Sequence, residues 1–138
     1  MRYLLHYKWS LAWVVLVLFL LLTPSNDMPD LNRFNLFPGT DKVVHLGIFF
    51  ILAILIYVES AIKSGWSQSR WKTMVKVVLS TVVFAALTEE AQLHISSRSG
   101  DIMDLLADCI GIGMATFAYL LIYRKKDEKS NIGTEYDR

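Results

Sequence analysis

Four apolar stretches, each close to the length that crosses a membrane, constrain the fold of this chain more than any other feature. They cover approximately residues 9–23, 42–60, 73–94 and 101–123, with short polar or proline-containing segments between them. A helix needs about 20 predominantly apolar residues to cross a bilayer. We therefore predict an all-α polytopic membrane protein, an antiparallel bundle of four transmembrane helices over residues 1–123. Residues 124–138 form a polar tail that we expect to be cytoplasmic and disordered.

The composition excludes several other classes of protein. Hydrophobic residues make up 54% of the 138 residues and charged residues only 20%, which is too apolar for a soluble domain of this size. The formal net charge of +1 gives no argument for a nucleic-acid partner. The first apolar stretch follows Arg2 and Lys8 as in a signal peptide, but no small-residue cleavage pattern follows it. We interpret that stretch as a retained helix.

The positions of lysine and arginine predict the orientation of the chain in a bacterial cytoplasmic membrane. Ten basic residues fall on one side of the predicted helices: Arg2, Lys8, Lys63, Arg70, Lys72, Lys76, Arg124, Lys125, Lys126 and Lys129. The other side carries only Arg33, Lys42 and Arg98. Cytoplasmic loops carry the excess of basic residues in membrane proteins. Both termini are therefore expected in the cytoplasm.

Ionisable residues recur near the outer ends of three predicted helices. Asp41 stands as an N-cap for the second helix, and His45 follows about 6 Å further along. Asp101 is placed to cap the fourth helix, which puts Asp108 about 10 Å further in. The third helix runs outward and brings Glu89 to the same level. These side chains should share the outer third of the bilayer.

The same residues share helix faces. Glu89 and Gln92 are three residues apart and lie on one stripe of the third helix, whereas Glu90 turns away from it. On the fourth helix, spacings of three and four keep one face polar and then small, through Asp101, Asp104, Ala107, Asp108, Gly111, Ala115 and Ala118. Small residues let a neighbouring helix approach closely. We predict that this face packs inward, with Gly111 and Ala115 at the helix contact.

Each polar residue also has a simpler interpretation. Asp101 can serve only as a helix cap, and Glu90 can lie among lipid headgroups. Arg98 can form a forked pair with a carboxylate or contact a lipid phosphate. His45 could bind a metal together with the acids, but one histidine is thin evidence, and a hydrogen-bonded histidine is the preferred interpretation. We therefore predict neither a metal nor another cofactor.

The polar segments, taken in order, resemble the VanZ-like membrane proteins. The resemblance rests on Asp41-Lys42-Val43-Val44-His45, on Glu89-Glu90-Ala91-Gln92, and on Arg98-Ser99-Gly100-Asp101-Ile102-Met103-Asp104 with Gly111, and it covers roughly residues 11–123. Carried over by position, the family's polar residues correspond to Asp41, Lys42, His45, Glu89, Gln92, Arg98, Asp101, Asp104 and Gly111. One position departs from the family pattern, because Asp108 stands where the family usually has asparagine.

The resemblance implies a cell-envelope protein, in a family whose name-giving member is linked to glycopeptide resistance with a preference for lipid-tailed teicoplanin. We predict an outward polar pocket that binds or modifies an amphipathic lipid-linked molecule. The candidate catalytic residues are His45, Glu89 and Asp104, and the candidate substrate-binding residues are Asp41, Lys42, Gln92, Arg98, Asp101 and Asp108. Two alternatives remain open, an intramembrane proton or cation relay and an accessory subunit without catalysis. Whether the chain is an enzyme stays open as well.

Overall fold

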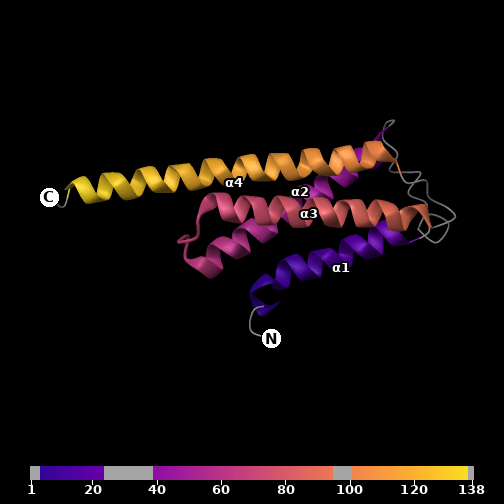
Figure 1. Cartoon of the computed structure of the whole chain (residues 1–138), viewed down its shortest axis with the longest axis horizontal. Helices are drawn as coiled ribbons and strands as arrows, with labels where there is room; N and C mark the ends of the chain where they lie inside the picture. Colours follow the sequence, from indigo (N-terminus) through magenta and orange to yellow (C-terminus); the bar gives the residue numbers. More distant parts are fainter. Residues whose placement is uncertain (1–3, 24–38, 95–100, 137–138) are drawn as a thin grey trace.

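The computed structural model describes residues 4–23, 39–94 and 101–136, and these residues form helices joined by turns, with no strand among them. A short 3-10 helix, η1 (Leu4–Tyr7), leads into α1 (Lys8–Leu22), which is followed by α2 (Thr40–Ser64), α3 (Arg70–Leu93) and α4 (Ile102–Tyr136). Figure 1 shows that the four α-helices alternate in direction, so that α1 and α3 end where α2 and α4 begin. The predicted all-α class is confirmed.

Two local expectations need correction. Asp41 is not the N-cap of α2, because the helix begins one residue earlier and Gly39 occupies the cap position at φ +91°. Glycine adopts this left-handed conformation without the penalty that a side chain would bring. The tail is not disordered up to its end either, since α4 continues through Tyr136. Lysine and glutamate are frequent directly after Arg124, and these residue types favour helix.

The helices pack through a core that α2 and α4 dominate, since these two make the most extensive contact. Tyr57 of α2 and Tyr119 of α4 stack with ring centroids 4.2 Å apart, and the Tyr57 hydroxyl bonds Thr116 at 3.0 Å. Nearer the start of α4, a Cβ added to Gly111 would lie 2.3 Å from the Leu46 carbonyl oxygen. The two backbones approach so closely there that no side chain fits between them.

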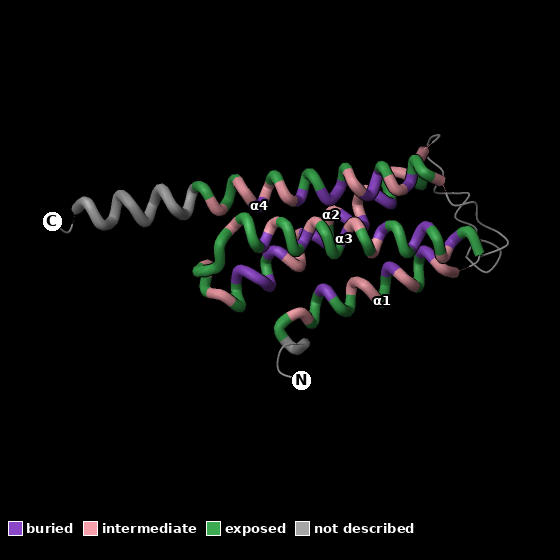
Figure 2. Tube along the Cα trace, viewed as in Figure 1, coloured by how far each residue is buried: buried purple, intermediate pink, exposed green. Residues whose placement is uncertain are grey.

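The surface of the fold is more apolar than that of a soluble protein. Large apolar side chains are exposed along all four helices, for example Phe19 on α1, Ile62 on α2, Leu79 on α3 and Phe117 on α4. Figure 2 shows exposed positions recurring along each helix and buried positions facing the neighbours. The interior holds many polar side chains, among them His45, Glu59, Thr81, Thr88, Glu89, Gln92, Asp104 and Asp108. This pattern fits a lipid environment, where outward residues must be apolar.

Length and apolar composition together separate two of the helices from the others. The whole of α2 and the part of α4 up to Arg124 are long and apolar enough to cross a membrane. The apolar helix α1 is shorter. Helix length and composition therefore identify two spanning candidates among the described residues.

Buried polar side chains fasten both ends of α1 to its neighbours. Glu59 of α2 accepts hydrogen bonds from the backbone N–H groups of Trp9 and Ser10 at 2.9 and 3.2 Å, and from the Ser10 hydroxyl. At the other end, the Gln92 side-chain amide of α3 donates to the Leu21 carbonyl at 3.0 Å. The first N–H groups and last carbonyls of a helix have no partner within it. Glu59 and Gln92 therefore supply partners for two N–H groups and one carbonyl at the ends of α1.

Candidate functional site

Six ionisable side chains meet at the end of the molecule where α2 and α4 begin. Lys42 and His45 come from the first turns of α2, Glu89 from the last turns of α3, and Asp101, Asp104 and Asp108 from the start of α4. We call this group the polar cluster. Its members converge because α3 runs opposite to α2 and α4, so that the end of one helix lies beside the beginnings of two others (Figure 1).

The outer part of the polar cluster is an ion network around Lys42. The Lys42 Nζ lies 2.8 Å from Asp101 Oδ2 and 2.9 Å from Asp104 Oδ1, and Asp41 Oδ2 is 3.4 Å away. The hydrogen bond from Lys42 lowers the pKa of Asp101, and a bond from the Met103 N–H to the same carboxylate adds to this effect. Lys42 thus joins the first turn of α2 to the first turn of α4.

Asp101 combines the ion pair with two local roles. Its Oδ1 accepts the Met103 N–H at 2.9 Å, and its carbonyl accepts the Asp104 N–H at 2.8 Å, so the predicted cap of the fourth helix is present. The Asp101 backbone N–H also donates to Glu89 Oε2 at 3.3 Å. The same residue therefore caps α4, binds Lys42 and contacts α3.

The inner part of the polar cluster is more deeply buried. His45 Nδ1 lies 3.1 Å from Asp108 Oδ1 and 3.8 Å from Glu89 Oε1. Asp108 has no exposed surface, and His45 is 4% exposed. Within the described part of the chain, Glu89 Oε1 and Asp108 Oδ2 have no hydrogen-bond partner. Burying such polar atoms unpaired costs free energy, so this part of the cluster is suited to take up a proton, a cation or a polar ligand group.

The inner residues also meet the geometric requirement for binding a metal ion. One potential ligand atom from each of His45, Glu89 and Asp108 lies within 4.8 Å of the others. A histidine nitrogen with two carboxylate oxygens is a donor set that Zn²⁺ and related ions accept. The side chains could therefore hold an ion, although the His45–Asp108 hydrogen bond would first have to open.

A cleft of about 240 Å³ adjoins the polar cluster between α3 and α4. Its lining combines carboxylates with apolar side chains, namely Ala86, Glu89, Glu90, Leu93, Asp101, Ile102 and Leu105. Glu89 and Asp101 belong to both the cleft and the cluster. A molecule in the cleft would therefore meet both acidic groups and hydrocarbon.

Comparison with known proteins identifies the family. The sequence model described as VanZ/LLP1 matches residues 5–123. The chain belongs to the VanZ/LLP1 family. The predicted VanZ-like membership is thereby confirmed. The polar cluster and the adjoining cleft both lie within the matched residues.

Two curated relatives extend the comparison of this VanZ/LLP1 protein. The uncharacterized membrane protein YwnJ of Bacillus subtilis (strain 168) is 32% identical over 110 residues, which cover 72% of this chain and 69% of YwnJ. An uncharacterized protein of Schizosaccharomyces pombe is 28% identical over 95 residues, and the chain spans 54% of its length. No solved structure matches the chain. Together with the apolar helices, the family and YwnJ indicate a membrane protein.

Two other predicted site residues of this VanZ/LLP1 protein that the structure describes, Asp41 and Gln92, are not members of the polar cluster. Gln92 is buried but turns toward α1, where it binds Leu21. Asp41 lies at the rim, with its side chain 61% exposed. Glu90 is exposed, as the helix register predicts, yet it lines the cleft. Arg98 lies outside the described residues.

Proposed function

We propose that this VanZ/LLP1 protein crosses a bacterial cytoplasmic membrane four times, with both termini in the cytoplasm. The apolar side chains exposed on α1 and α3 support this proposal, because Phe19, Leu79 and Leu87 would otherwise face water. The fifteen-residue α1 can cross with the help of η1 before it. The excess of basic residues at the opposite end supports an orientation with the polar cluster near the outer surface.

We further propose that the protein binds an amphipathic lipid-linked molecule of the cell envelope at this outer end. The observation that carries the proposal is the cleft between α3 and α4, where carboxylates and apolar side chains face the same space. The polar part of a ligand would meet Glu89 and Asp101, while its lipid tail would follow Leu93 and Leu105 toward the bilayer. A preformed concave site with few polar groups and an apolar wall is typical of small-molecule binding.

Within this proposal, the ion network sets the shape of the site. Lys42 holds Asp101 and Asp104 at 2.8 and 2.9 Å, which fixes the start of α4 against α2. His45 does not line the cleft, but it lies 3.8 Å from Glu89 and 3.1 Å from Asp108, so it would act on a ligand through Glu89. Modification of the ligand would assign His45, Glu89 or Asp104 to proton transfer, because such groups act as general acids and bases when they lie beside a substrate.

A proton or cation relay is the second candidate function. The unpartnered oxygens of Glu89 and Asp108 beside His45 favour it, since a buried carboxylate can exchange a proton with a neighbouring imidazole. A relay predicts that proteoliposomes containing the protein take up protons, as a trapped pH-sensitive dye would report, and that Glu89→Gln blocks this uptake. Binding of the lipid-linked molecule alone predicts no proton uptake.

The binding proposal can be tested with teicoplanin as an amphipathic probe and a glycopeptide without a lipid tail as its comparison. We expect purified full-length protein to bind teicoplanin at least about tenfold more tightly than the untailed compound, because the tail buries apolar surface. Glu89→Gln and His45→Ala should each weaken teicoplanin binding by about tenfold. A tenfold loss of affinity corresponds to the free energy of about one polar contact. The family link to resistance predicts a parallel loss of teicoplanin tolerance in cells.

His94→Ala is the matched control for His45→Ala. His94 is exposed at the end of α3, and its Nδ1 contacts only the Glu90 carbonyl at 2.9 Å among the described residues. Glu90→Gln does not serve as a control for Glu89→Gln, because Glu90 lines the same cleft. Equal binding of the tailed and untailed compounds, or equal losses with His45→Ala and His94→Ala, would reject the proposed site.

A further inference from the structure

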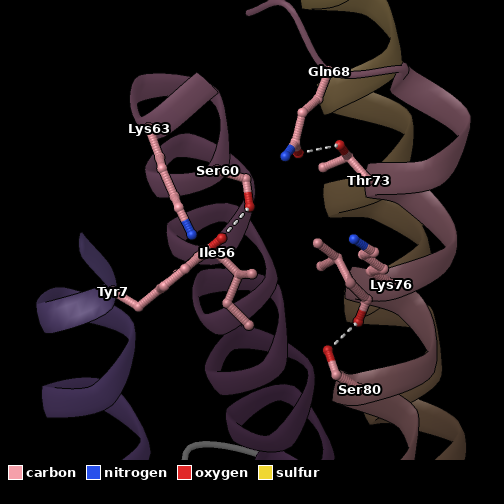
Figure 3. A pocket seen from close by; sticks show the side chains of 9 residues that line it. Tyr7, Ile56, Ser60, Lys63, Gln68, Thr73, Lys76 and Ser80 are labelled. Carbon is pink, nitrogen blue, oxygen red and sulfur yellow. Dashed lines mark hydrogen bonds between the residues drawn. The ribbon is translucent and has the colours of Figure 1, made fainter. Parts of the chain in front are cut away.

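A second cavity, of about 200 Å³, lies at the opposite end of the molecule between η1, α2 and α3. Most of its lining is polar, including Tyr7, Ser60, Lys63, Gln68, Thr73 and Lys76. Figure 3 shows these side chains arranged around the space near the end of α2 and the start of α3. The described lining contains two ammonium groups and no carboxylate. Its chemistry is therefore the reverse of that in the acidic cleft.

The nearest buried acid does not line this cavity. Glu59 precedes Ser60 in the chain, but its two oxygens accept bonds from the first turn of α1. Lys76 of α3 lies within 4 Å of no carboxylate among the described residues. Lys63 of α2 lies 5.2 Å from the centre of the Tyr7 ring. With two lysines and no carboxylate in its lining, the cavity has a net positive lining that can attract an anion.

Hydroxyl and amide groups supply hydrogen-bond donors beside the two lysines. The Tyr7 and Ser60 hydroxyls lie 3.1 Å apart, so one of the two hydrogens remains available for another acceptor. Gln68 accepts a bond from the Thr73 hydroxyl at 3.3 Å through its oxygen, which leaves its amide hydrogens free to donate (Figure 3). A phosphate group accepts several hydrogen bonds and carries negative charge. The cavity offers both kinds of partner.

The position of the cavity favours a phosphate that belongs to a lipid. Exposed apolar residues border this end of the helices, with Ile62 on α2, and Trp71 and Val75 on α3. Ile56 and Val77 form the apolar part of the cavity wall. A lipid whose headgroup is held by Lys63 and Lys76 could keep its acyl chains against these exposed apolar side chains. Basic pockets between transmembrane helices are known to bind anionic headgroups.

We propose that this cavity binds the phosphate-bearing headgroup of an anionic phospholipid. The proposal uses none of the residues of the polar cluster. Its test is therefore independent of the test for ligand binding at the other end of the molecule. Its probe is phosphatidylglycerol, compared with phosphatidylcholine of the same acyl chains. Lipid bound to the purified full-length protein can be counted by native mass spectrometry, and inorganic phosphate serves as the competitor.

The decisive comparison is between Lys63→Gln/Lys76→Gln and Lys72→Gln. Lys72 lies on the same exposed end of α3, but it does not line the cavity, so its removal changes only the general charge. We expect the double variant to require on the order of tenfold more phosphatidylglycerol for the same occupancy, since each lysine near a membrane surface contributes to anion attraction. Lys72→Gln should keep the wild-type occupancy. Lys76→Gln alone, at an exposed position that should not affect folding, should give an intermediate loss.

Three results would overturn the proposal. Equal losses in the double variant and in Lys72→Gln would mean that only general surface charge attracts the lipid. Equal occupancy by phosphatidylglycerol and phosphatidylcholine would mean that the cavity does not recognise the negative charge of the headgroup. Complete displacement of the lipid by millimolar inorganic phosphate would mean that the cavity binds free phosphate instead of a lipid headgroup.

Discussion

Asp108 is the residue at which this chain departs most clearly from the pattern it resembles. Its Oδ1 contacts His45 at 3.1 Å, while its Oδ2 is buried without a hydrogen-bond partner in the described part of the chain. Asparagine, the residue that the resemblance leads one to expect, would keep the oxygen that faces His45 and remove the buried charge. A buried charge is costly unless it is fully paired.

We therefore predict that Asp108→Asn is tolerated and Asp108→Ala is not. The asparagine variant should melt at or above the wild-type temperature, because it keeps an acceptor for His45. The alanine variant should lose about 2 to 3 kcal/mol, because it leaves the buried imidazole without this partner. Thermal unfolding of the purified protein in detergent measures both. If asparagine proves as damaging as alanine, the negative charge itself stabilises His45.

At the scale of the elements, the contact between α2 and α4 depends on a glycine, which has no side chain to separate the two backbones. A Cβ at Gly111 would lie 2.3 Å from the Leu46 carbonyl oxygen and 3.1 Å from the Phe50 backbone nitrogen. Gly113, on the other side of α4, has no atom within 4 Å of such a Cβ. The predicted small-residue face therefore corresponds to the closest helix approach.

This contrast gives a matched pair of substitutions. Gly111→Ala should destabilise the protein by about 1 to 3 kcal/mol, because the helices must separate. Gly113→Ala should stabilise it slightly, since alanine favours helix by up to about 1 kcal/mol relative to glycine. Gly111→Leu should prevent folding, and Gly113→Leu should not. Melting temperature and the monodisperse fraction in size-exclusion chromatography report the difference. Similar losses at the two positions would show that the α2–α4 contact does not limit stability.

At the scale of the whole molecule, the proposed orientation places the polar cluster outside and the lysine-lined cavity inside. We predict that a cysteine introduced at Gly39 reacts with a membrane-impermeant maleimide in intact cells, because it precedes α2 at the outer end. A cysteine at Ser130 in α4 should react only after the cells are opened. Both changes are made in a Cys109→Ala background to remove the natural thiol. Labelling of Ser130 in intact cells, with Gly39 protected, would reverse the orientation.

Much of the fold was predictable from local sequence. Apolar runs of sufficient length specify helices wherever the chain meets lipid, so α1 to α3 and the start of α4 lie close to their predicted positions. The three- and four-residue spacings from Asp101 to Gly111 also fixed which face of α4 turns inward. The predicted cap at Asp101 could be found because aspartate before a helix has a local hydrogen-bonding role. The extension of α4 was missed because a polar tail resembles a disordered one, although its residues favour helix.

The partners of the buried polar groups were decided by tertiary structure. Gln92 lies on the predicted stripe with Glu89, yet one binds the end of α1 and the other approaches His45, because α3 packs between two different neighbours. The sequence shows Glu59 only as an acid near the end of α2. Its role as acceptor for the N–H groups at the start of α1 follows from the packing of α1 against α2. Helix periodicity assigns a side chain to a face. The neighbour that meets that face is determined by the packing of distant segments, and that packing is not encoded in any local pattern.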